Sequence, residues 1–232
     1  CSSVRAMAEI SSPEAQDVDN PTFAAVFPPS SKLEAYGMAF DDMAVFEQAG
    51  HPREHIGQLA TYGFVNFSGM RALLEGIASK LHPELPTPEL EKALAGHRFL
   101  DLGSGDGRAV IGAAVLVPTL AEAAGVELSV LRHDLAVRNR KRLPEELRSI
   151  VRFDQCDIME VTPSRLGSTE IVWLANLRFP DEAVAAINER LVFDCGNEVD
   201  AVVATLREVD FSSRPHTAWV EQVSMSWNPE GW

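Results

Sequence analysis

The chain has 232 residues, of which 34 are acidic and 20 are basic, and its formal net charge is -14 at pH 7. This length suits one domain with a helical extension and is sufficient to bury a sizeable core. The negative charge argues against an electrostatic grip on nucleic acid or on anionic membranes. No apolar run approaches the roughly 18 residues that a membrane helix requires. We therefore expect neither a nucleic-acid partner nor a membrane partner.

The three cysteines, Cys1, Cys156 and Cys195, show no CxxC spacing. This pattern predicts a reducing compartment and no disulfide framework. We accordingly expect an intracellular protein of the nucleus or cytoplasm rather than of an organelle. The chain starts at Cys1 instead of a methionine, which suggests a leader or a longer N-terminus.

The first part of the chain divides into two regions. Residues 1–30 are rich in Ser, Pro, Ala and acids without a sustained period, which predicts a tail or an arm. Residues 41–50 carry acids in a first turn and end on glycine, and residues 68–81 repeat apolar side chains at helical spacing. Residues 31–96 are therefore predicted to form an N-terminal helical region.

The sequence His51-Pro52-Arg53-Glu54-His55 matches the H-x-x-E-H pattern of inverted zinc peptidases. That chemistry needs both histidines on one helical face and a distant carboxylate as a third ligand. Here the motif straddles a Gly-Pro break, where a helix is at best beginning. We interpret His51 and His55 as loop residues and expect no metal.

Residues 97–108 combine a short apolar strand with a glycine-rich turn, and the apolar run 109–115 continues as a helix. The pattern is typical of the opening of a βαβ nucleotide-binding unit. Gly103, Gly105 and Gly107 allow a tight turn and let a ligand approach the backbone closely. The α/β alternation begins only at this point, so residues 97–232 are predicted to be the cofactor-binding core.

Acidic residues end three successive predicted strands: Asp101, Glu127 and Asp157. In an open parallel sheet, ligands lie over the carboxyl ends of the strands, where an acid can bind ribose hydroxyls or an adenine amino group. Asp106 lies at the helix N-terminus, where a pyrophosphate would otherwise dock. Because carboxylates repel phosphate, the favoured ligand is a positively charged nucleoside without phosphate. S-adenosyl-L-methionine is such a molecule. The predicted cofactor residues are Asp101, Gly103, Ser104, Gly105, Glu127 and Asp157.

Further strands are predicted within residues 170–176 and 200–209, and a sixth, antiparallel at the sheet edge, within 218–227. Residues 180–191 form a helix, and the basic helix 132–142 presents a solvated face. The predicted fold is thus α/β: a Rossmann-like class I methyltransferase core, with a central mostly parallel sheet, helices on both faces and an N-terminal helical extension.

The order of motifs resembles the disruptor-of-telomeric-silencing family, the histone-lysine methyltransferases that are not built on the SET fold. The likeness covers residues 60–227 and rests on Tyr62-Gly63, residues 101–105, Gly125-Val126-Glu127, Asp157 and the Asn176 to Phe179 segment. It implies a protein-lysine methyltransferase that uses S-adenosyl-L-methionine, with a protein partner that presents an accessible lysine, such as a histone.

The resemblance also implies the acceptor site. Tyr62, Asn176 and Phe179 would line a lysine channel, Asn176 by hydrogen bonding and the aromatic rings by excluding water and facing the cation. Two positions depart from the family pattern, since Ala175 replaces its first asparagine and Phe64 replaces its glutamate.

Residues 101–108 also resemble the same motif in small mitochondrial lysine methyltransferases, over one βα unit only. Two other functions stay open. One is methylation of a non-histone protein or a small molecule, for which we expect a closed, apolar acceptor pocket. The other is a cofactor-binding module without catalysis, which Ala175 and Phe64 favour.

Overall fold

The computed structural model describes residues 2–7, 20–28, 31, 39–48, 50, 52–59, 63–84, 89–213 and 216–222. Within these ranges no helix is long and apolar enough to cross a membrane.

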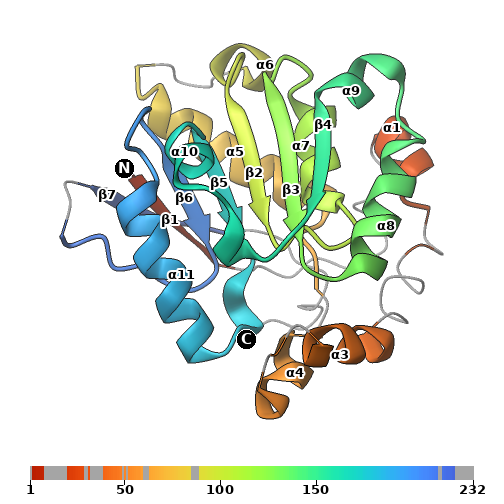
Figure 1. Ribbon diagram of the computed structural model, residues 1–232. Coiled ribbons are helices and arrows are strands. Elements are labelled where there is room, and N and C mark those ends of the chain that lie inside the picture. Colours follow the sequence, from red (N-terminus) through yellow and green to blue (C-terminus); the bar gives the residue numbers. More distant parts are fainter. Residues whose placement is uncertain are drawn as a thin grey trace.

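A twisted parallel sheet forms the centre of the molecule (Figure 1). Its strands follow the spatial order β4-β3-β2-β5-β6-β1-β7, and every pairing among these described strands is parallel. The bounds are β1 Ser2–Met7, β2 Arg98–Leu102, β3 Glu122–Glu127, β4 Val151–Gln155, β5 Ile171–Leu174, β6 Val202–Thr205 and β7 Thr217–Gln222. The run from β4 to β6 has the order 3-2-1-4-5 of doubly wound folds.

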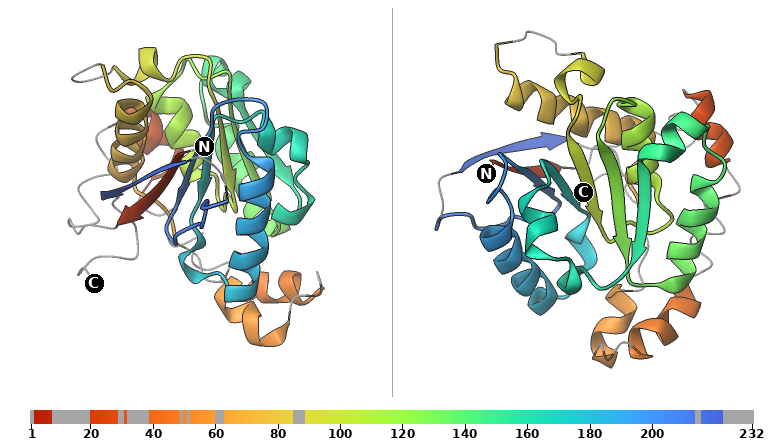
Figure 2. Two further views of the ribbon diagram at one scale, coloured as in Figure 1. Left: turned by 90° about the vertical axis from the view of Figure 1, so that its left-hand side faces the viewer. Right: turned by 45° about the horizontal axis from the view of Figure 1, so that its top comes forward.

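Helices cover both faces of this sheet (Figures 1 and 2). The described α-helices are α1 Pro21–Val26, α3 Ala39–Gln48, α4 Arg53–Leu59, α5 Phe67–Leu81, α6 Leu90–Ala93, α7 Arg108–Leu116, α8 Val130–Arg140, α9 Glu145–Ile150, α10 Pro163–Gly167 and α11 Asp181–Asp194. The helices predicted over 41–50, 68–81 and 180–191 correspond to α3, α5 and α11.

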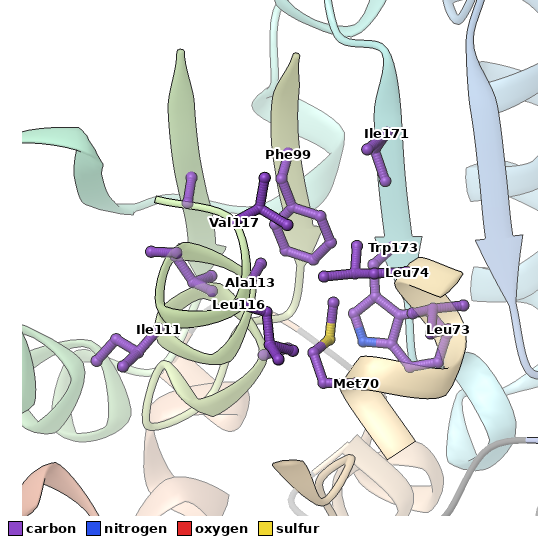
Figure 3. Packing of buried hydrophobic residues seen from close by; sticks show 14 of the residues in the cluster. Met70, Leu73, Leu74, Phe99, Ile111, Ala113, Leu116, Val117, Ile171 and Trp173 are labelled. Atoms are coloured by element: carbon purple, nitrogen blue, oxygen red, sulfur yellow. The ribbon is translucent and has the colours of Figure 1, made fainter. Parts of the chain in front are cut away.

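Neighbouring residues of each central strand point to opposite faces and build two separate cores. Phe99, Ile171 and Trp173 pack against α5 and α7 on one face, as Figure 3 shows with Met70 and Leu74 of α5. On the other face the core contains strand residues and side chains from α10 and α11: Leu100, Leu102, Val126, Val172, Leu174, Leu166, Ile187 and Leu191. Because both faces are buried, the strands are continuously apolar rather than alternating.

The outer part of the sheet differs from the expected arrangement. The region predicted to be a tail or arm supplies β1, which lies between β6 and β7 and pairs in parallel with both. The edge strand over 217–222 is consequently parallel, and the prediction of an antiparallel edge is wrong. Strand patterning reports which side chains are buried, but it carries no information on strand direction. Residues 223–227 of the predicted strand lie outside the described residues.

The helix predicted to present a solvated basic face is α8. Arg138, Lys141 and Arg142 of that face are exposed, whereas Arg140 is half-buried. Arg140 donates through Nε to the Val151 carbonyl (2.6 Å) and through Nη2 to the Arg148 carbonyl (2.8 Å). The Arg140 guanidinium therefore ties α8 to β4 and α9.

The strand order reverses between β2 and β5. The chain continues from β2 to β3 and β4 on one side of this pair, and from β5 to β6 on the other side. Such a switch point opens a crevice at the carboxyl ends of the strands. Helices α3 and α4 lie beyond that same edge, at the bottom of Figure 1.

Candidate functional site

The glycine-rich turn follows β2 at the switch point. Gly107 has φ +86°, and a Cβ on this residue would lie 2.5 Å from the Phe153 ring, so only glycine fits without displacing that ring. Gly125 in β3 has the same restriction, because its Cβ would lie 2.5 Å from that of Ser104. These close contacts hold the glycine-rich turn against β3, close to Glu127.

The Glu127 carboxylate connects this turn to the end of β3. Its Oε2 accepts a hydrogen bond from the Gly105 N–H (2.8 Å) and its Oε1 accepts one from the Ser129 N–H (2.8 Å). The residue is 5% exposed and lines a cavity of about 510 Å3.

Asp101 lies one residue before the end of β2, opposite Gly125 and Trp173 of the neighbouring strands. Its side chain is 3% exposed, and Oδ1 has no hydrogen-bond partner among the described residues. Burial raises the pKa of this carboxyl well above its usual range, and the charges of Glu127 and Asp106 raise it further. A buried acid of this kind binds a cation favourably, because the cation offsets the cost of ionisation.

A space of about 20 Å3 adjoins Asp101, Ser104 and Trp173. It is large enough for one water molecule or one ammonium group. Ser104 Oγ, like Asp101 Oδ1, is buried without a hydrogen-bond partner among the described residues. The two predicted cofactor residues thus present unsatisfied acceptors toward the same small space.

Asp106, also acidic, is neutralised inside the protein. Arg108 Nε donates to its Oδ2 (2.9 Å), and the Arg108 guanidinium lies between the rings of Phe27 and Phe64, 4.4 and 4.3 Å from their centroids. Arg108 Nη2 also donates to Ser31 Oγ (2.7 Å). Phe64, which departs from the family pattern, is therefore a stacking partner of this arginine.

This cavity of about 510 Å3 opens at the carboxyl edge of β2, β3 and β5. Its floor includes Gly103, Gly105 and Glu127. Its remaining wall is predominantly apolar and comes from α3, α4, α11 and the segments after β4 and β5: Phe46, Pro52, Ile158, Met159, Ala175, Leu177, Phe179, Ala183, Ala186 and Ile187.

Asp157 lies on the cavity wall, as its position after β4 predicts. Its side chain caps the short 3-10 turn Ile158–Glu160 by accepting from the Met159 N–H (2.8 Å), and Glu160 accepts in return from the Asp157 N–H. This capping box fixes the carboxylate at the rim of the cavity.

Of the two predicted acceptor residues that the structure describes, Phe179 lines the cavity and Asn176 does not. A Cβ added at Gly103 would lie 3.6 Å from the Phe179 ring, which shows how closely the ring approaches the glycine turn. Tyr62 lies outside the described residues.

Asn176 does not line the cavity, and the structure corrects the channel position predicted for it. Its side chain is fully buried, and Oδ1 accepts from the N–H groups of Leu206 (3.1 Å) and Arg207 (2.8 Å) at the end of β6. The short 3-10 turn Asn176–Arg178 points this side chain into the protein, while Leu177, Arg178 and Phe179 line the cavity. Asn176 therefore joins the segment after β5 to β6.

His55 is a site residue that the sequence did not reveal. It belongs to α4 rather than to a loop, it lines the cavity, and its Nε2 lies 3.6 Å from Oε2 of Glu182 in α11. Its partner in the zinc-like motif, His51, lies outside the described residues. Among the residues with described positions, no group of three His, Cys, Asp or Glu could hold a metal ion.

No protein-family model matches the chain, and no curated protein matches its sequence. Solved structures do match. An RNA methyltransferase from Salinibacter ruber, in complex with S-adenosyl-L-homocysteine, is 24% identical over 52% of this chain and 69% of its own, with a TM-score of 0.37. The methyltransferase domain of bacterial CtHen1 is 18% identical over 60% of this chain and 65% of its own, with a TM-score of 0.43.

A geranyl diphosphate methyltransferase in complex with GPP and sinefungin is 18% identical over 56% of this chain, with a TM-score of 0.38. This chain spans 44% of that structure's length and less than two thirds of the CtHen1 domain. The expected Rossmann-like class I fold is confirmed, and its assignment rests on the strand order and on the helices that cover both faces.

Proposed function

We propose that the protein is an S-adenosyl-L-methionine-dependent methyltransferase. The observation that carries this proposal is the buried pair of acids around the glycine turn: Glu127, which lines the cavity, and Asp101, whose Oδ1 lacks a partner among the described residues. Both fit a cationic nucleoside, and both would repel a nucleotide phosphate.

In this arrangement Glu127 accepts hydrogen bonds from the ribose hydroxyls, and Asp157 accepts one from the adenine amino group. Asp101 and Ser104 face the α-amine of the methionine part, either directly or through a water in the adjoining space. Gly103 and Gly105 let the ligand lie against the backbone. The Phe179 ring, which is in reach of Gly103, excludes water from the methyl group.

When bound, S-adenosyl-L-methionine supplies an electrophilic methyl group on a sulfonium. The protein's task is to hold an acceptor atom in line with that methyl group, in a site from which water is excluded. The cavity of about 510 Å3 falls within the range of sites for small ligands, and its walls are largely apolar.

The proposal also concerns the identity of the methyl acceptor. The sequence resemblance supports a protein lysine, and exposed Glu182 at the cavity would attract a cation. The apolar walls support a small molecule instead, as does Asn176, whose side chain is turned away from the cavity. We favour the small molecule on these two observations.

The test of the cofactor site is calorimetry with S-adenosyl-L-homocysteine. Glu127→Ala removes contacts of about 1.5–3 kcal/mol per hydrogen bond, so we expect its affinity to fall at least about tenfold. Glu122→Ala is the matched control, because Glu122 begins the same strand at the opposite edge and pairs with Arg152 (3.0 Å). Tight binding of NAD by the parent, or an unchanged affinity in Glu127→Ala, would contradict the proposal.

A further inference from the structure

Helices α3 and α4 form a cap over the cavity, attached to two of its walls. Phe46 of α3 and Ile56 of α4 are buried against Leu128, which follows β3. On the other side, His55 of α4 faces Glu182 at the start of α11. Figures 1 and 2 show this helix pair beyond the carboxyl edge of the sheet, separate from the helices that cover its faces.

The cap places the His55 side chain on the wall of the cavity. The His55 side chain is 25% exposed and the Glu182 side chain is 78% exposed, so the pair lies at the cavity mouth. Nε2 is the His55 nitrogen on the Glu182 side, which leaves Nδ1 for another partner. The carboxylate, in turn, stabilises the ring once it is protonated.

The α3–α4 cap thus lies across the cavity from the glycine turn, and the acceptor must occupy the space between them. We propose that this space binds a small, largely apolar molecule with a phenolic hydroxyl, and that His55, held by Glu182, takes the hydroxyl proton. This inference rests on the proposed methyltransferase function and names its acceptor. Imidazole suits a phenol, whose pKa is near 10 as in tyrosine, much better than it suits a far less acidic aliphatic alcohol.

The step balances without another reactant. The O–H proton moves to His55 Nδ1 while an oxygen lone pair forms the new O–CH3 bond, and the electrons of the breaking S–CH3 bond stay on sulfur. The products are a methyl ether, S-adenosyl-L-homocysteine and an imidazolium paired with Glu182. The imidazolium then returns its proton to water, to which the His55 side chain is 25% exposed.

Other charged side chains line the cavity together with His55. The charged side chains that share the cavity with it come from β3, α8, the segment after β4, the 3-10 turn after β5 and α11: Glu127, Arg132, Asp157, Arg178 and Glu182. On its own helix pair, Arg53 is engaged with Glu47 (2.6 Å), and Glu54 is exposed. Glu182 is the carboxylate in ion-pair range of the ring.

The experiment separates acceptor binding from cofactor binding. Calorimetry first measures S-adenosyl-L-homocysteine alone, and then a panel of phenols, including 2-naphthol and 4-nitrophenol, in its presence. His55→Gln and Glu182→Gln are compared with two controls: His97→Gln, at the amino edge of the sheet, and Glu189→Gln, an exposed acid further along α11. We expect the four variants to keep the parent's S-adenosyl-L-homocysteine affinity within about twofold.

The rate of methylation of the phenol that binds most tightly should then distinguish the variants from one another. General base catalysis contributes about 100-fold or more, so we expect His55→Gln to lose about that factor in kcat with little change in KM. Glu182→Gln should lower kcat about tenfold with little change in KM, because the imidazolium loses its carboxylate. Neither control should lower kcat.

The outcomes distinguish the two proposals. Binding of S-adenosyl-L-homocysteine without binding of any phenol would overturn the acceptor assignment and leave the cofactor proposal standing. Methylation confined to lysines of a histone mixture would do the same. An unchanged kcat in His55→Gln would show that His55 does not take the hydroxyl proton. No binding of S-adenosyl-L-homocysteine would overturn the proposed function itself.

Discussion

Arg108 and Asp106 form an ion pair in which Nε and Oδ2 are 2.9 Å apart and neither side chain is more than 2% exposed. The pair lies directly after the glycine turn, and the rings of Phe27 and Phe64 enclose the guanidinium. It therefore joins the cofactor turn to two segments that precede the α/β core in the sequence.

Arg108→Met should strongly destabilise the protein, because it leaves the Asp106 carboxylate buried without its cation. Breaking a buried pair in this way costs about 3–5 kcal/mol, which urea denaturation would measure. The double variant Asp106→Asn with Arg108→Met should recover part of the loss, since no buried charge remains. Equal destabilisation by the single and double variants would contradict this account.

Gly107→Ala should cost more stability than Gly96→Ala. Both glycines have φ near +80°, but a Cβ at Gly96 meets no atom within 4 Å, whereas a Cβ at Gly107 would overlap Phe153. Overpacking adds about 1–3 kcal/mol to the shared backbone strain. The difference between the two unfolding free energies therefore measures the overlap, and S-adenosyl-L-homocysteine affinity should fall only for Gly107→Ala.

Asp101→Asn should stabilise the ligand-free protein at neutral pH and weaken cofactor binding. The raised pKa of Asp101 means that its ionisation opposes folding: the cost is absent below the unfolded value of 3.8 and complete above the folded pKa. The gain in unfolding free energy should thus shrink as the pH falls toward 3.8. A variant that is stabilised equally at all pH values would disprove this origin.

Proton exchange on binding provides a second measurement at the same residue. If a cation binds to ionised Asp101, the parent releases a proton when S-adenosyl-L-homocysteine binds at a pH below the raised pKa. The calorimetric enthalpy then depends on the ionisation enthalpy of the buffer. Asp101→Asn should remove that contribution, and its affinity should be at least about tenfold weaker, as for one lost charged hydrogen bond.

Asn176→Ala should lower stability by about 1–3 kcal/mol, because the buried N–H of Leu206 and the N–H of Arg207 lose their common acceptor. Asn176→Asp retains an acceptor oxygen and serves as the control. Activity per folded molecule should change less than stability does. An Asn176→Ala variant with normal stability and a large loss of kcat would instead support the predicted position of Asn176 in the acceptor site.

The central fold could be predicted from the sequence because its signals are local. The apolar strand, the three glycines and the acids at strand ends are each visible within a few residues, and they correctly indicate the carboxyl edge where Asp101 and Glu127 lie. Burial on both faces also explains why the strands lack alternation.

What the sequence did not reveal depends on distant contacts. His55 becomes a site residue only because α4 is placed beside Glu182, 127 positions further along the chain. Asn176 has the residue type of an acceptor ligand, but the 3-10 turn after β5 directs its side chain toward Leu206. Neither residue carries a local pattern that would indicate which way it points.

The place of β1 between β6 and β7 has a consequence for synthesis. Ser2 pairs with Val202 and Thr217, so β1 is translated before these neighbours and meets them only after some two hundred further residues have been made. At ribosomal rates of about 5–20 residues per second, β1 waits roughly 10–40 s for β7. Throughout that interval its N–H and C=O groups lack their final partners, and an unpaired strand can add to the sheet of another chain. This topology therefore favours one kind of misassembly, in which two nascent copies exchange their β1 strands.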